Sequence, residues 1–119
     1  YGWPIVTYGE EYAGGPIAVH TSFPGYEDPV SVWVPSIAPS GLAVYRGSAF
    51  PALDGALLAG GLRSRDVRVL RIGADGRPAS EHRIEVGGSV RDVRVGPDGL
   101  IYVLLREGDA RILRLRPAP

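Results

Sequence analysis

Apolar and polar residues alternate in short runs along most of the chain, with the two-residue period that is typical of β-strands. Clusters of Gly, Pro, Asp and Ser separate the runs and favour tight turns. The runs span Val30–Val34, Leu42–Arg46, Ala56–Ala59, Val67–Ile72, Glu81–Val86, Arg91–Val95, Ile101–Arg106 and Arg111–Arg116. No segment has a helical period of useful length, so the sequence predicts an all-β fold.

The clearest hairpin is predicted over residues 89–105, where two strands flank a Gly-Pro-Asp-Gly turn. Pro97 presets the φ angle that a turn requires, and the carboxylate of Asp98 can accept hydrogen bonds from the nearby backbone. Gly99 adopts a positive φ without steric cost. Other turns are predicted at Pro39-Ser40-Gly41 and at Gly60-Gly61.

An internal echo refines the all-β prediction. The segment Arg68–Ile72 (RVLRI) recurs as Arg111–Leu115 (RILRL), with a period of about 40–45 residues that is typical of four-stranded propeller blades. Residues 42–86 would form one blade and residues 91–116 three strands of another. A propeller needs at least about four blades, so about two and a half blades cannot close a ring. A small sandwich or barrel with an accidental echo is the alternative.

The first part of the chain differs in composition from the rest. Residues 1–29 are rich in Gly, Pro and Tyr and show little periodicity, which predicts a long loop. Their aromatic side chains favour an ordered loop. We therefore expect one propeller portion with three parts: a loop over residues 1–29, an inter-blade strand and one blade over 30–87, and a last partial blade over 88–119.

Composition restricts the class of protein. The 13 basic and 13 acidic residues balance, which gives no indication of a nucleic-acid or anionic-membrane partner. The absence of Cys excludes disulfides, thiolate metal sites and Cys nucleophiles. No apolar run reaches the roughly 18 residues that span a bilayer. All basic residues are Arg, and Lys, Asn, Gln and Met are absent, which fits a thermophile or a GC-rich genome equally well.

Few residues suggest binding chemistry on their own. Arg63 follows a strand end, and Arg91 is expected at a comparable place in the next blade; two such guanidinium groups suit bidentate recognition of carboxylates. The alternative is surface pairing with Asp66 or Asp92. Tyr12 either contacts a planar ligand or packs under the loop.

The two histidines give no further site. His20 and His82 are isolated in the sequence, without the spacing of a metal site or a catalytic base.

Several segments, in their order and spacing, resemble the soluble PQQ-dependent aldose sugar dehydrogenases. They are YGWP with YGEEY in residues 1–12, VWVPSIAPSG in residues 32–41, the G-x-x-FP loop of residues 47–51, GLR in residues 61–63 and RDVRVGPDG in residues 91–99. The match extends over almost the whole chain, and the combination of motifs is specific to the family.

The resemblance implies a six-bladed propeller that binds pyrroloquinoline quinone (PQQ) and Ca²⁺ in a cleft on its top face. Members of that family oxidise the C1 hydroxyl of aldoses: a His is the general base, hydride passes to the quinone, and Ca²⁺ polarises it. This chain resembles the C-terminal third. The general-base His belongs to earlier blades, so no catalytic residue is expected here and the 119 residues alone should be inactive.

The same resemblance implies partners and a location. The partners are the aldose substrate, the N-terminal remainder of the propeller and an external electron acceptor, in the periplasm or outside the cell. The abrupt start at Tyr1 agrees with a position inside a longer sequence. A catalytically inactive propeller that serves as a binding module is one alternative, and an unrelated all-β interaction domain is another.

The resemblance also assigns individual residues. Those that align with cofactor contacts are Tyr12, Gly61, Leu62, Arg63, Ser89, Val90 and Arg91. Arg63 aligns with a basic residue, often Lys, that reaches the quinone carboxylates, and residues 89–91 align with an Arg-x-Arg segment that has the same role. Ser89 replaces the first of these arginines and removes one charge. Tyr1 aligns with a residue that contributes its backbone carbonyl to a structural Ca²⁺ site.

Overall fold

The computed structural model describes residues 2–106, 108 and 110–118 of the chain. These residues contain seven strands and one short 3-10 helix, η1 (Pro51–Leu53), so the predicted all-β fold is confirmed. The chain forms two compact units, residues 1–36 and residues 37–119, and the seven strands belong to the second.

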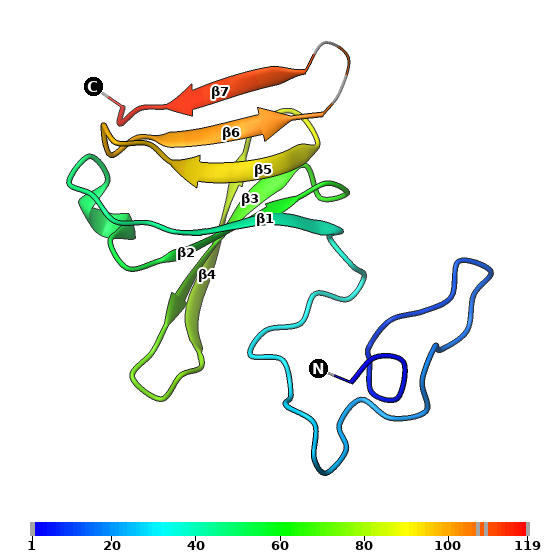
Figure 1. Cartoon of the computed structure of the whole chain (residues 1–119). Helices are drawn as coiled ribbons and strands as arrows, with labels where there is room; N and C mark the ends of the chain where they lie inside the picture. The colour runs from blue at the N-terminus through cyan, green and yellow to red at the C-terminus, as the bar shows by residue number, and fades with distance from the viewer. Residues whose placement is uncertain (1, 107, 109, 119) are drawn as a thin grey trace. The chain divides into compact units, whose positions relative to one another are not determined.

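The second unit consists of two antiparallel sheets in which each strand pairs with its sequence neighbour (Figure 1). The four-stranded sheet contains β1 (Pro39–Val44), β2 (Leu57–Gly61), β3 (Asp66–Ile72) and β4 (Pro78–Glu85), in that order. The three-stranded sheet contains β5 (Val90–Val95), β6 (Ile101–Leu105) and β7 (Arg111–Leu115). This repeated order is that of consecutive propeller blades. The echoed segments lie in β3 and β7, the third strand of each sheet.

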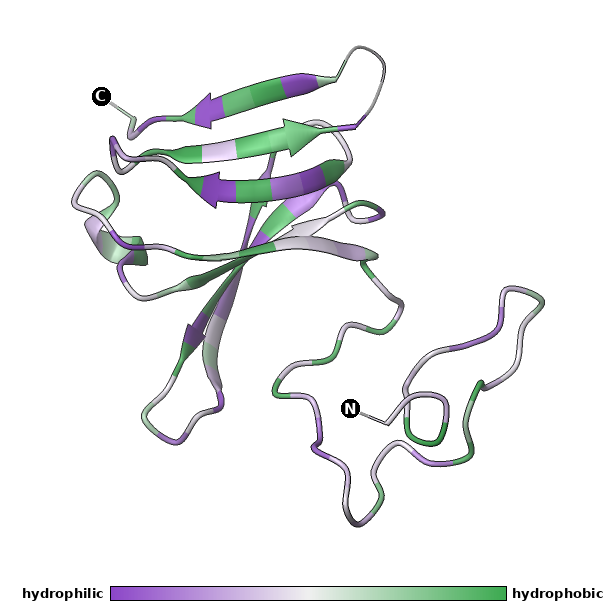
Figure 2. Cartoon of the chain, viewed as in Figure 1, coloured by the Kyte–Doolittle hydropathy of each residue, from purple (hydrophilic) through white to green (hydrophobic). Residues whose placement is uncertain are grey.

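The hydrophobic core lies between the two sheets. Residues directly opposite each other in an antiparallel ladder share a face of the sheet. The pairs Leu58–Val69 and Gly60–Val67 therefore lie on one face of the first sheet. Leu58, Val67 and Val69 pack there against apolar side chains of the second sheet, namely Val90, Val93, Ile101, Val103 and Leu105. Figure 2 shows the alternation of hydrophobic and hydrophilic residues along β5 and β7 that leaves one apolar face.

A β-bulge explains the spacing of buried residues in β5. Val90 pairs with Leu105 and Asp92 pairs with Leu104, so Arg91 is an extra residue without a partner in the ladder. Val90 and Val93 are both buried although they are three positions apart. In a regular strand such residues would face opposite sides of the sheet, but the extra residue of the bulge places both on the same side. Such bulges often redirect a side chain at a functional site.

The turn between β5 and β6 has the predicted chemistry. Gly99 has a φ of 72°, and the Gly96 N–H donates to the Leu100 carbonyl at 2.8 Å. The Asp98 carboxylate accepts hydrogen bonds from the Tyr102 hydroxyl at 2.7 Å and the Leu100 N–H at 3.1 Å. The Tyr102 hydroxyl, and after it the Leu100 N–H, lower the pKa of Asp98.

Three local predictions are wrong. Residues 30–34 alternate like a strand but form none, because no segment of the described chain pairs with them in a ladder. The predicted turns at residues 39–41 and at Gly60-Gly61 lie inside β1 and β2. Gly60 is required there by packing, since a Cβ at this position would lie 2.5 Å from Cγ1 of Val90.

The first unit is a loop held by a few backbone contacts. Isolated bridges join Val6 to His20 and Glu10 to Pro16, and the Thr7 N–H donates to the His20 carbonyl at 3.0 Å. The rings of Phe23 and Tyr26 lie 6.4 Å apart. Within the described residues, no helix has the length and apolar character needed to cross a membrane.

Candidate functional site

A cavity of about 530 Å³ lies at the end of the two sheets where β2 and β6 terminate. Its lining residues are Ala38, Leu62, Arg63, Ser89 and Arg106. Small-molecule sites commonly have volumes of about 300 to 1,000 Å³. The structure thus brings together Leu62, Arg63 and Ser89, three of the residues that the sequence assigned to a binding site.

The turn after β2 places Arg63 at this cavity. The N–H groups of Leu62 and Arg63 donate to the carbonyls of Ala38 and Ile37, both at 3.0 Å, which fixes the backbone of the turn. Gly61 allows the close approach of chain segments in this turn. A Cβ at this position would lie 3.3 Å from the Ile37 carbonyl oxygen and would collide with Ser64 Oγ. Gly61 is therefore needed for the shape of the turn.

A buried carboxylate accepts a hydrogen bond from the turn that carries Arg63. Asp66 is fully buried at the start of β3 and accepts hydrogen bonds from Ser64 Oγ at 2.5 Å and from Arg83 Nε at 2.6 Å. Arg68 Nε also donates to it, at 3.1 Å, and Arg68 binds Glu81 at 2.6 Å. Burial by itself raises the pKa of Asp66, but the hydrogen bonds from Ser64, Arg83 and Arg68 outweigh it and lower the pKa below its ordinary value.

Ser89 and Arg106 meet across the ladder of the second sheet. The Arg106 N–H donates to the Ser89 carbonyl at 3.0 Å, just beyond the Val90–Leu105 pair. The turn that carries Arg63 contacts the segment before Ser89 as well, since the Arg65 guanidinium donates to the Gly87 carbonyl at 3.5 Å. The loops that line the cavity are therefore connected by hydrogen bonds.

The cavity has a positive electrostatic character. Of the described residues that line it, two are charged, and both are arginines, Arg63 and Arg106. Within residues 2–106, 108 and 110–118, their guanidinium groups form no ion pair and no side-chain hydrogen bond. Two uncompensated cations on one cavity favour an anionic ligand.

The interpretation of Arg63 and Arg91 as partners of nearby aspartates is wrong. The oxygens of Asp66 are taken by Ser64 and by other arginines, and Asp92 forms an ion pair with Arg94 at 3.0 Å. Among the described residues, Arg91 is like Arg63 in having no carboxylate partner.

Arg91 and Val90 differ from the arrangement expected of them. Arg91 lines a separate cavity of about 480 Å³, whose other lining residues are Ser40, Gly41, Leu42, Asp92, Arg94 and Leu104. Arg91 also lies at the start of β5, the first strand of its sheet, whereas Arg63 follows a second strand, so the two positions are not equivalent. The Val90 side chain is buried in the core, which leaves its backbone as the part nearest the cavity.

The other assigned residues lie in the first unit. Tyr12 is fully exposed, at 111% of the reference surface, so packing under the loop is not its role. Tyr1 lies outside the described residues. The rings of His20 and Phe23 lie 5.1 Å apart and are tilted by 48°, and His82 is exposed on β4. In the described part of the chain, no three side chains of His, Cys, Asp or Glu gather as a metal site would require.

Arg106 is a cavity residue that the sequence reasoning did not find. In the sequence analysis it is only the last residue of the predicted strand Ile101–Arg106. The internal echo contains the missing signal: Arg106 follows Arg63 by 43 positions, the same separation as between Arg68 and Arg111.

Known proteins match this chain closely. The family model for glucose/sorbosone dehydrogenase matches residues 1–114. An uncharacterized protein of Synechocystis is 45% identical over 97% of this chain, and the aldose sugar dehydrogenase of Escherichia coli is 39% identical over 98%. The chain spans 28% and 32% of the lengths of these two relatives.

Solved structures of sugar dehydrogenases are also similar to this chain. A glucose dehydrogenase crystal structure superposes with a TM-score of 0.89 at 36% identity, over 99% of this chain and 35% of its own. The apo form of the soluble aldose sugar dehydrogenase of E. coli gives a TM-score of 0.85 at 38% identity, over 96% of this chain and 34% of its own.

Proposed function

The chain belongs to the glucose/sorbosone dehydrogenase family, and from this we propose that residues 1–119 are the C-terminal part of a PQQ-dependent aldose sugar dehydrogenase. The complete protein would oxidise the C1 hydroxyl of an aldose to a lactone, in the periplasm or outside the cell. The observation that carries the proposal is the cavity where Arg63, Leu62 and Ser89 converge.

The lining of this cavity fits the chemistry of PQQ, a planar quinone with several carboxylate groups. Arg63 offers a planar fork of N–H donors that matches a carboxylate. Leu62 offers apolar surface for a ring. When bound, PQQ supplies a hydride acceptor that no side chain provides.

In this proposal the chain binds and orients the cofactor. The backbone of the turn at residues 61–65 is fixed by hydrogen bonds, so little backbone freedom is lost when a carboxylate binds Arg63. On the family resemblance alone, Tyr12, Val90 through its backbone, and Arg91, which lines the neighbouring cavity, are proposed as further contacts.

The remaining functions are assigned to the rest of the propeller. The general base, part of the aldose site and the contact with an external electron acceptor are proposed to lie outside these residues, so residues 1–119 alone would be inactive. Calcium is expected from the resemblance alone. The described acidic residues do not cluster as a Ca²⁺ site would require. Tyr1, the proposed contact of the ion, lies outside the described residues. No step is therefore assigned to calcium here.

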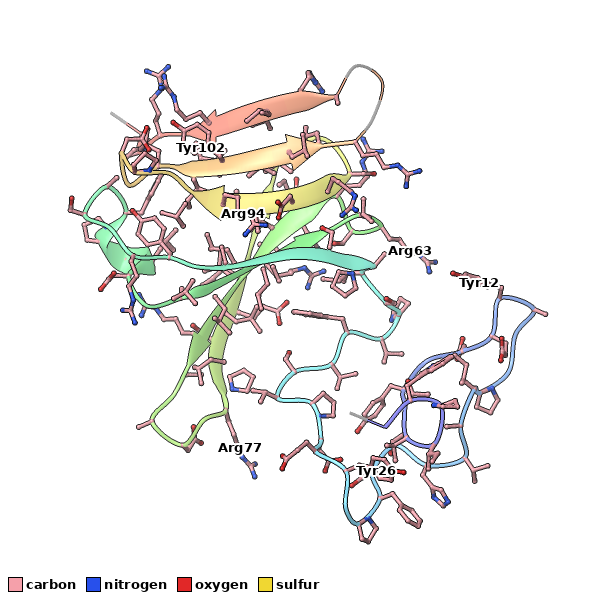
Figure 3. All side chains as sticks on the ribbon, in the orientation of Figure 1. Tyr12, Tyr26, Arg63, Arg77, Arg94 and Tyr102 are labelled. Carbon is pink, nitrogen blue, oxygen red and sulfur yellow. The ribbon has the colours of Figure 1, made fainter. Side chains whose placement is uncertain are left out.

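Titration of PQQ into the full-length protein tests the proposal. We expect saturable binding, followed by dye-linked oxidation of aldoses in the presence of Ca²⁺. Arg63→Ala should raise the Kd about 10- to 100-fold, because a hydrogen bond to a charged group contributes about 1.5–3 kcal/mol. Arg77→Ala is the matched control, since Figure 3 shows Arg63 and Arg77 at opposite ends of the first sheet.

The outcomes separate the candidate functions. Saturable binding without turnover would favour an inactive binding module, to which the substitution at Ser89 points. An absence of PQQ binding to the full-length protein would contradict the proposal.

A further inference from the structure

Arg63 and Arg106 lie at corresponding hairpins of the two sheets. Arg63 lies two residues beyond the end of β2, and Arg106 follows directly after the end of β6; each of these is the second strand of its sheet. The 43-residue separation between them equals the separation of the echoed segments in β3 and β7. The repeat thus places a guanidinium group at the same hairpin of both sheets.

The two arginines also face a common space. Both line the 530 Å³ cavity, and no acidic residue is among the described residues that line it. Backbone hydrogen bonds fix both residues: the Arg63 N–H bonds to the Ile37 carbonyl and the Arg106 N–H to the Ser89 carbonyl, each at 3.0 Å. Because Arg106 is anchored directly to Ser89, its side chain starts beside the position at which the family resemblance leads us to expect an arginine.

We propose that Arg106 is an anion-binding residue of this cavity and that it supplies the charge that Ser89 does not. This inference rests on the proposed function, in which a carboxylate-bearing cofactor occupies the cavity. Its guanidinium forms no ion pair with any described residue, so binding a carboxylate does not require an existing pair to break. The positive charge is thus supplied by the residue after β6 instead of by the residue before β5.

The proposal can be tested by removing the charge of Arg106 and then introducing an arginine at position 89. The Kd for PQQ is measured by fluorescence quenching in the full-length protein, for the wild type and for Arg106→Ala, Arg106→Gln and Arg77→Ala. We expect both Arg106 variants to bind PQQ about 10- to 100-fold more weakly, as the loss of one charge-assisted contact implies, and Arg77→Ala to bind like the wild type. The Ser89→Arg/Arg106→Ala double variant should recover most of the lost affinity.

A salt titration gives a second readout that is independent of turnover. Each Arg106 variant should show a weaker dependence of Kd on ionic strength than the wild type, because one charge has been removed from the site. Arg106 is exposed, so thermal unfolding of the variants should match that of the wild type.

The failure of this inference differs from the failure of the proposed function. If the wild type binds PQQ and both Arg106 variants bind it within twofold, the inference is overturned and the proposed function stands. If the wild type does not bind PQQ, the same variants are titrated with citrate, a simple tricarboxylate. Weaker citrate binding by the Arg106 variants alone would support the anion site, and equal or absent binding would overturn it.

Discussion

At the scale of single residues, Asp66 has the most consequential environment. A fully buried carboxylate is costly unless hydrogen bonds and opposite charges compensate it. Here Ser64, Arg68 and Arg83 provide that compensation, and Ser64 belongs to the turn that carries Arg63. The cluster therefore connects the stability of β3 with the geometry of the candidate site.

The lowered pKa of Asp66 makes a prediction about pH. A group whose pKa is lower in the folded state stabilises the fold above its unfolded pKa, here an ordinary value of 3.8, and loses this contribution as the pH falls through the folded value. Asp66→Asn should lower the free energy of unfolding at pH 7 by about 3 kcal/mol, because two arginines lose a buried partner. The further loss of stability below pH 4 should be smaller than in the wild type.

Denaturant unfolding of the full-length protein between pH 2 and pH 7 measures both effects. Asp54→Asn is the control, because Asp54 pairs with Arg46 at 3.8 Å with both side chains more than half exposed. It should change stability by less than about 1 kcal/mol. A pH profile of Asp66→Asn that runs parallel to that of the wild type would contradict the role assigned to the carboxylate.

At the scale of elements, the contact between β1 and β5 joins the two sheets. Ser40 Oγ lies 2.7 Å from the Val90 carbonyl and 3.1 Å from the Gly60 carbonyl, so it connects both sheets near the candidate site. Gly41 lies beside it, and a Cβ there would lie 2.8 Å from the backbone nitrogen of Val93 and 2.9 Å from Cα of Asp92. The close approach of these strands requires glycine.

Gly41→Ala should therefore separate β1 from β5. The methyl group meets backbone atoms that cannot move alone, and we expect a destabilisation of about 1–3 kcal/mol, the usual cost of overpacking. Gly73→Ala is the matched control, because the Cβ would meet an exposed side-chain oxygen of Asp75, which can rotate away, and no backbone atom closer than 3.5 Å. Comparable denaturant midpoints for the two variants would show that the β1–β5 contact tolerates a side chain.

Elements whose conformation depends on local chemistry were predicted correctly from the sequence. The turn at residues 96–99 formed as expected, because Asp98 and Gly99 have local backbone preferences that need no partner. The segment 30–34 did not form the predicted strand, since alternation cannot supply a partner for its backbone hydrogen bonds. Gly60 is predicted as part of a turn from sequence, but its small size serves packing of β2 against Val90, which lies far along the chain.

At the scale of the whole molecule, the candidate site was predictable only in part. Arg63 and Ser89 were found through motifs, and the cavity brings them together. Arg106 was missed although the 43-residue spacing of the repeat marks its position, because its place across the ladder from Ser89 is visible only in the structure. Arg91 was expected beside Arg63, but the bulge in β5 gives it a different cavity. Strand register therefore determines which charges share a site.

The shared core predicts that the two sheets of the second unit unfold together. Leu58 in β2 is fully buried and belongs to a cluster with residues of both sheets. Leu58→Ala should lower the free energy of unfolding by about 2–5 kcal/mol, through lost burial and a residual cavity. Ile112→Ala is the control: this side chain on β7 is 70% exposed, and its removal should cost less than about 0.5 kcal/mol.

Native-state hydrogen exchange distinguishes joint from separate unfolding. If both sheets depend on one core, Leu58→Ala should reduce the protection of slow amides in β3 and in β6 by the same free energy. Reduced protection in β3 with unchanged protection in β6 would mean that each sheet unfolds alone. Equal reductions would imply that damage to one sheet also releases Arg106 from its position at the cavity, because the strand before it belongs to the same cooperative unit.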